Sequence, residues 1–246
     1  MNRLKIFAAR NSKEILRDPL NLAFGIGFPV VVLLLLSAIQ ANIPVSLFEI
    51  EHLIPGIVVF GFSFLSLFSA TLIAKDKTTS FLTRLFASPL TAADYIFGYA
   101  LPILPMAMAQ GVICFILAFF LGLSVSWNAL LAVLVQIPTA IFFIGLGLLA
   151  GSLFNDKQVG GICGALLTNL SAWLSGTWFD LELVGGAFKT IAYLLPFAHA
   201  TDAGRAALSG EYTAILPHLW WVIGYAVVAM ILAIAAFWRK MSAENT

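Results

Sequence analysis

Charge is the scarcest property of this 246-residue chain. Only 10% of its residues are Asp, Glu, Lys or Arg, whereas an ordinary soluble domain has about 25%. Hydrophobic residues make up 61%, and the mean hydropathy is +0.99. A soluble domain is excluded, and the composition predicts an all-α polytopic membrane protein. The net charge of +1 and the lack of a basic tract speak against a nucleic-acid partner.

Cysteine and histidine are also rare. Cys114 and Cys163 both lie in apolar runs, so we interpret them as small packing residues rather than a disulfide or a metal pair. His52, His199 and His218 could in principle meet as a metal site. Because they lack the paired spacing of metal ligands, we interpret them as interfacial or capping residues. The sequence therefore predicts no metal site.

Several catalytic motifs are missing. There is no His-Glu-x-x-His, no nucleophile elbow and no acid pair within an apolar run, so an integral membrane enzyme is disfavoured. No GxxxxGK[ST] phosphate loop occurs, and the chain does not bind and hydrolyse ATP in the usual way by itself. No ionisable residue lies well inside an apolar run, which argues against an ion-coupled secondary transporter. No cofactor is predicted.

The first 18 residues are basic and amphipathic. Their positive charges are Arg3, Lys5, Arg10, Lys13 and Arg17. Leu4, Phe7, Ala8 and Ile15 fall near one helical face, which predicts an interfacial helix over 1–18, and Pro19 is placed to start the next helix. The alternative is a frayed basic tail that only sets topology. No cleavable signal peptide is evident.

Six apolar runs follow, each with the roughly 20 residues needed to cross a bilayer core. They are 20–40, 53–74, 95–122, 128–153, 158–177 and 217–238. Prolines inside these runs should bend them: Pro29, Pro102, Pro105 and Pro138. The spacing of Gly147 and Gly151 allows close helix packing, although such spacing also occurs by chance.

The distribution of lysine and arginine predicts the orientation. All of them except Lys189 and Arg205 fall on one side of a six-span arrangement. By the positive-inside rule, both termini are cytoplasmic and the chain is integral to the plasma (inner) membrane, as a single transmembrane domain over 1–246. The half-apolar segment 178–216 then lies outside, where we expect two short helices that dip into the outer leaflet.

The loop over 75–94 is the longest charged interruption in the first two thirds of the chain. Phe81, Leu82, Leu85 and Phe86 form an apolar stripe that predicts a short amphipathic helix, ended by Ser88-Pro89. Thr91 and Asp94 form a capping pattern before the third run. Either this helix only orders the loop, or it is a handle for a soluble partner.

Taken in order, the motifs resemble those of one family. They are Arg17-Asp18-Pro19, Leu53-Ile54-Pro55-Gly56, Arg84-Leu85, Ala87-Ser88-Pro89-Leu90 with Tyr95 and Gly98, Leu174-Ser175-Gly176, and Leu195-Pro196 with Arg205. Their order and spacing over nearly the whole chain are similar to the permease subunit of type-2 ABC exporters.

This resemblance implies that Thr79–Phe86 is a coupling helix that docks onto a separate ABC ATPase subunit. The residues it assigns to ATPase coupling are Thr79, Phe81, Leu82, Arg84, Leu85 and Phe86. It also implies two permease subunits, identical or homologous, above two ATPases, with the substrate path between the permeases. Segment 178–210 would close that path outside, and its outer-gate residues are Trp178, Phe179, Pro196 and Arg205.

Two stretches depart from the family pattern. Ser80–Thr83 replaces a Gly-Thr-Leu-Glu-like run, so an acidic contact to the ATPase is either missing or replaced by Asp76. Trp178-Phe179-Asp180 replaces a proline shortly after Leu-Ser-Gly, which affects the shape of the outer gate.

The function expected from these observations is ATP-driven export of an amphipathic molecule: a drug, a lipid or a natural product. Uncharged spans and the aromatic residues Trp173, Trp178 and Phe179 suit such a substrate, although aromatic belts also arise from membrane anchoring. The alternative is a facilitator or channel-like protein that works without an ATPase.

Overall fold

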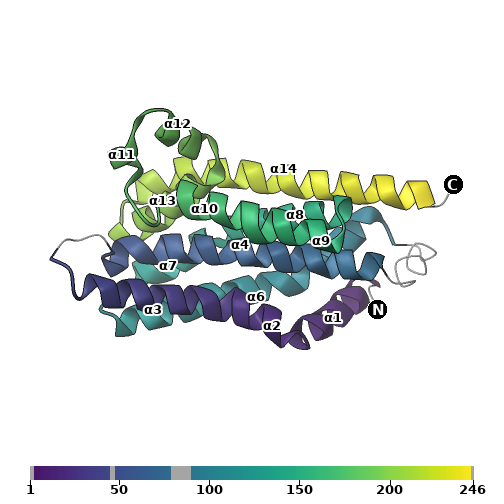
Figure 1. Ribbon diagram of the computed structural model, residues 1–246, viewed down its shortest axis with the longest axis horizontal. Coiled ribbons are helices and arrows are strands. Elements are labelled where there is room, and N and C mark those ends of the chain that lie inside the picture. Colours follow the sequence, from purple (N-terminus) through teal and green to yellow (C-terminus); the bar gives the residue numbers. More distant parts are fainter. Residues whose placement is uncertain (1–2, 45–47, 79–89, 245–246) are drawn as a thin grey trace.

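The computed structural model describes residues 3–44, 48–78 and 90–244, and each regular element in these ranges is a helix. Five helical stretches in this part of the chain are long and apolar enough to cross a membrane. They are Pro19–Gln40, Ile50–Lys77, Ala92–Phe120, Trp127–Leu153 and Tyr212–Ser242. These five match the first four and the last of the predicted spans. The helices lie side by side along the long axis, and both termini are at one end (Figure 1). We call this the termini end and the opposite one the distal end.

Helix α1 (Arg3–Leu16) confirms the predicted N-terminal helix, and its Phe7 and Ile15 are buried. After it, α2 (Pro19–Leu22), the π-helix η1 (Ala23–Gly27) and α3 (Phe28–Gln40) form one continuous run. Asp18 caps α2 and Pro19 occupies its first turn, because proline has no backbone N–H to leave unsatisfied there. The π-helix ends two residues before Pro29. Pro29 has no backbone N–H, so the regular helical hydrogen bonding is interrupted here.

Helix α4 (Ile50–Lys77) is the most deeply buried of the five long helices, with α8 (Ile137–Leu153) packed along it. A Cβ at Gly147 would lie 2.1 Å from the Ser66 carbonyl oxygen, and one at Gly151 would lie 2.6 Å from that of Ala70. Glycine at both positions therefore lets the two backbones touch, so this small-residue spacing serves helix packing.

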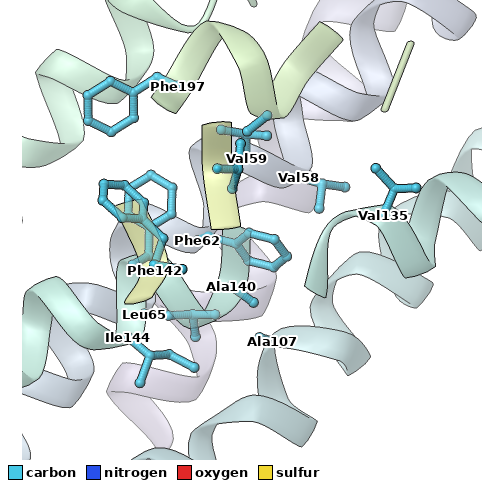
Figure 2. Close-up of a cluster of buried hydrophobic side chains, with 14 of the residues drawn as sticks. Val58, Val59, Phe62, Leu65, Ala107, Val135, Ala140, Phe142, Ile144 and Phe197 are labelled. Carbon is cyan, nitrogen blue, oxygen red and sulfur yellow. The ribbon is translucent and has the colours of Figure 1, made fainter. Parts of the chain in front are cut away.

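Helices α6 (Ala92–Phe120), α7 (Trp127–Val135) and α14 (Tyr212–Glu244) complete the bundle. A break at Gln136 separates α7 from α8, next to Pro138 in the first turn of α8, whereas Pro102 and Pro105 lie inside the continuous α6. Figure 2 shows a part of the apolar core to which several helices contribute. Its labelled residues are Val58, Val59, Phe62 and Leu65 of α4, Ala107 of α6, Val135 of α7, Ala140, Phe142 and Ile144 of α8, and Phe197 of α13.

The predicted fifth span, 158–177, corresponds to α9 (Asp156–Val159), the π-helix η2 (Gly160–Leu167) and α10 (Thr168–Leu174). This stretch is not among the five long apolar helices, since its first turn holds Asp156, Lys157 and Gln158 and its last part holds Asn169. It nevertheless runs along the bundle, with α9 toward the termini end and α10 toward the distal end (Figure 1).

Three helices, rather than the two expected, cover the distal end: α11 (Leu181–Val184), α12 (Gly186–Leu194) and α13 (Pro196–Ser209). Helix α12 ends two residues before Pro196, because the residue that precedes a proline is kept out of the helical conformation. Helix α13 ends at Gly210, which has a φ of +79° that L side chains rarely adopt. Helix α11 was missed because a four-residue helix has no periodicity to detect.

Candidate functional site

The residues expected to couple to an ATPase, Thr79, Phe81, Leu82, Arg84, Leu85 and Phe86, lie outside the described residues. The structure does describe both elements that hold this loop. On one side α4 ends at Lys77. On the other side Thr91 begins α6 with a capping box, in which its hydroxyl accepts from the Asp94 N–H and the Asp94 carboxylate accepts from the Thr91 N–H at 2.9 Å. The predicted cap is confirmed.

A buried carboxylate lies in the last turn of α4. Asp76 is 7% exposed, and Arg10 of α1 donates to its two oxygens at 2.7 and 3.0 Å. The Tyr99 hydroxyl of α6 donates to Asp76 Oδ2 at 2.8 Å. A buried carboxylate needs such partners, because desolvation of an unpaired charge is costly. Asp76 thus joins α1, α4 and α6.

Helix α1 is seated on α6 by the neighbours of this contact. The ring of Phe7 meets Tyr95 and Tyr99 edge-on, with centroid distances of 5.6 and 4.9 Å. A Cβ at Gly98 would lie 2.3 Å from Phe7 Cδ1, and Asn11 donates to the Gly98 carbonyl at 3.0 Å. Tyr95 and Gly98 of the sequence motif therefore form part of the surface of α6 on which α1 packs.

The two lysines beside Asp76 reach other elements. Lys75 pairs with Asp18, the cap of α2, at 3.2 Å. Lys77 donates to the carbonyls of Gly151, Ser152 and Phe154 at 2.8, 3.2 and 2.7 Å and so satisfies the C-terminal end of α8. Three successive residues of α4 thereby contact α1, the cap of α2, α6 and the C-terminal end of α8. We call Lys75, Asp76 and Lys77 with these partners the polar junction.

The role proposed for Asp76 from sequence, an acidic contact to an ATPase, does not fit this geometry. Its carboxylate points inward, to Arg10 and Tyr99. The sequence held no signal for this pairing, since Arg10 and Asp76 are 66 positions apart and Lys75–Lys77 reads as a solvated charge run.

A second cluster joins the motif residues at the distal end. Arg205 of α13 donates to the carbonyls of His52 at 3.0 Å and Gly176 at 2.8 Å, and pairs with Asp202 at 3.4 Å. It thus ties the start of α4 to the turn after α10. Burial lowers the pKa of the Arg205 guanidinium, and Asp202 offsets only part of this shift. We call Arg205 with these carbonyls the distal clamp.

Close backbone contacts support the distal clamp. A Cβ at Gly56 would lie 2.4 Å from Thr177 Oγ1, and one at Gly204 would lie 2.7 Å from Pro55 Cβ. The Leu53-Ile54-Pro55-Gly56 motif is therefore a packing surface for the turn over 175–177 and for α13.

The remaining predicted gate residues lie around the same turn. The ring of Trp178 meets Phe60 of α4 edge-on at 5.3 Å, and Phe179 lies between Trp173 and Phe188, with centroids 6.0 Å from each. Pro196 is buried in the first turn of α13, the helix that carries Arg205. The structure thus brings Arg205, Trp178 and Phe179 to the turn after α10. Pro196 starts α13, the helix that carries Arg205.

The comparison with known families gave a match. A family model described as ABC-2 type transporter matches residues 2–209. This chain belongs to the ABC-2 type transporter family. As an ABC-2 membrane protein it is the membrane permease of an ABC transporter, a transport subunit integral to the membrane. A search of curated proteins gave no match. The polar junction and the distal clamp both lie within the matched residues of this ABC-2 permease.

Proposed function

We propose that this ABC-2 permease exports an amphipathic substrate, driven by a separate ATPase that grips the loop over 79–89. The observation that carries the proposal is the polar junction. The loop is framed by Lys77 and Thr91, so a force on it enters α4 and α6 directly. Through Asp76 and Lys77 the same force reaches α1 and α8.

The proposed topology has six spans and both termini in the cytoplasm. With five long helices and both termini at one end, a further crossing is needed, and Asp156–Leu174 takes that role (Figure 1). Its 19 residues reach at most about 28 Å as an α-helix, close to the thickness of a bilayer core of about 30 Å. Its polar first turn then lies at the cytoplasmic surface.

An amphipathic substrate suits the walls of this permease. Its spans are apolar, and Trp173 and Phe179 gather with Trp178 at the proposed outer end, where the distal clamp holds the outer gate. We place the substrate path between this chain and a second permease subunit. The competing function is a facilitator that needs no ATPase. Such a protein would not need the polar junction to transmit force.

The test is reconstitution of the permease with its ATPase in proteoliposomes. We expect Leu85→Asp with Phe86→Asp to leave complex assembly measurable by copurification but to abolish substrate-stimulated ATP hydrolysis. Undiminished stimulation in an assembled complex would contradict the coupling role of the loop. Full transport by the permease alone would favour the facilitator.

A further inference from the structure

Two of the three histidines meet at the distal end. Nδ1 of His199 on α13 lies 2.8 Å from Nδ1 of His218 on α14. Nε2 of His199 lies 2.9 Å from the Tyr193 carbonyl at the end of α12. A carbonyl only accepts, so His199 carries its proton on Nε2 and, when neutral, has a bare Nδ1. His218 then donates through its Nδ1–H.

The number of protons on the two rings decides whether the hydrogen bond between His199 and His218 can form. With no charge or one charge on the two rings, one Nδ1 still carries a proton and the other accepts it. With two charges, both Nδ1 atoms carry protons, the hydrogen bond is lost and two like charges face each other. The second proton therefore belongs to the pair and not to either ring alone.

The same rings connect the distal helices to the last long helix. His199 links α14 to the end of α12, where Tyr225 of α14 also donates to the Leu194 carbonyl at 2.8 Å. The Tyr193 hydroxyl donates to Asp202 at 2.8 Å, and Asp202 pairs with Arg205 of the distal clamp. The histidine pair is thus part of the attachment that fastens α12 and α13 to α14.

We propose that His199 and His218 form a proton-operated latch, which fastens α12 and α13 to α14 at neutral pH and releases them when both rings are charged. The direction of the proton supply rests on the proposed function, which places this end outside the cell. Acid outside would then loosen the cover of the outer gate.

The surroundings of the pair give protons access to it and affect how readily the two rings become charged. His218 borders a surface cleft of about 470 Å³. The other ionisable groups around the pair are Glu49, Glu51 and His52 at the start of α4, Tyr193 on α12, Asp202 and Arg205 on α13, and Glu211 before α14. Burial lowers the pKa of His199 most, and His218 lowers it further, while the Tyr193 carbonyl and Asp202 raise it.

Spin-label distances test the latch in the full chain in lipid nanodiscs, without ATP or ATPase, so the result does not depend on the export function. Ile191→Cys on α12 and Leu232→Cys on α14 provide exposed sites, at 52% and 48%, whereas Cys114 and Cys163 are buried and stay unlabelled. Between about pH 7.5 and about pH 4.5, either side of the ordinary histidine pKa, the distance distribution should broaden and lose its neutral-pH component.

His218→Gln is the decisive variant, because its rotatable amide can donate to or accept from His199 but takes no proton. Its distribution should stay the same at both pH values, whereas His52→Gln, the matched control, should respond like the wild type. An unchanged wild-type distribution, or an equal response in His218→Gln, would overturn the latch. Ring nitrogen NMR of the wild type gives a second test: simultaneous protonation of both rings at the ordinary pKa would also overturn it.

Discussion

Arg10 in α1 donates two hydrogen bonds, of 2.7 and 3.0 Å, to Asp76 in the last turn of α4. The carboxylate is almost fully buried, and Tyr99 of α6 completes its shell. One charged group therefore fixes the relative positions of three helices at the point where the chain enters the proposed coupling loop.

Replacement of Asp76 by Asn should lower the free energy of unfolding by about 2 kcal/mol, because Arg10 keeps its charge in a half-buried site without its partner. Thermal unfolding in detergent measures this. Glu14→Gln removes an exposed partner of the same arginine, 3.6 Å away, and should cost less than about 0.5 kcal/mol. Equal losses of stability in Asp76→Asn and Glu14→Gln would contradict a special role for the buried Arg10–Asp76 contact.

Gly98→Ala should loosen α1 from α6. The added Cβ would lie 2.3 Å from Phe7, and the overpacking should cost about 1–3 kcal/mol. Limited proteolysis measures the exposure of α1, and cleavage after Arg10 should accelerate. Gly224→Ala is the matched control, since open space surrounds that glycine in α14. It should leave cleavage after Arg10 unchanged and raise the stability by up to about 1 kcal/mol, because alanine favours a helix more than glycine does.

Arg205→Lys should destabilise the distal end although it keeps the charge. A lysine lacks the planar fork that reaches the His52 and Gly176 carbonyls together, and the loss should be about 1–3 kcal/mol in thermal unfolding. Lys189→Ala is the comparison, because its pair with Glu182 is exposed, and it should stay within about 0.5 kcal/mol of wild type. A tolerated Arg205→Lys would show that the charge alone matters there.

Stability should fall as the pH falls below the ordinary histidine pKa of about 6.5. The pKa of His199 is lowered in the folded chain, mainly by burial, so the unfolded chain takes up the proton first. The contribution is present above the unfolded pKa and is lost as the pH falls through the folded one. Thermal unfolding from about pH 7.5 to about pH 5 should show this slope, and His199→Gln should flatten it. A slope that is unchanged in His199→Gln would assign it to other groups.

Much of the fold was accessible from the sequence because apolar runs and positive charges are local signals. The first four and the last spans, the Thr91 cap and Pro19 at a helix start were all predicted and are confirmed. The run over 158–177 was predicted as a span on the same grounds, but it is not among the five long apolar helices of the described residues, since polar residues at its start and near its end lower its hydropathy.

The sites were only partly accessible. Motif residues such as Gly56, Gly98 and Arg205 were identified, but their partners Thr177, Phe7 and the His52 carbonyl lie far away in sequence. No periodicity links Arg10 to Asp76 or His199 to His218, because such pairs are set by how helices pack. The sequence analysis used lysines in charge runs only to predict topology. In the structure, Lys77 donates hydrogen bonds to carbonyl groups at the C-terminal end of α8.

The central claim is that the polar junction carries the force of the ATPase into the spans. The most direct test is the number of substrate molecules moved per ATP hydrolysed in proteoliposomes that hold the complete complex, with Asp76→Asn compared with Glu14→Gln. We predict that Asp76→Asn keeps ATP hydrolysis but moves far fewer substrate molecules per ATP, while Glu14→Gln matches the wild type. A wild-type ratio in assembled Asp76→Asn complexes would contradict the account.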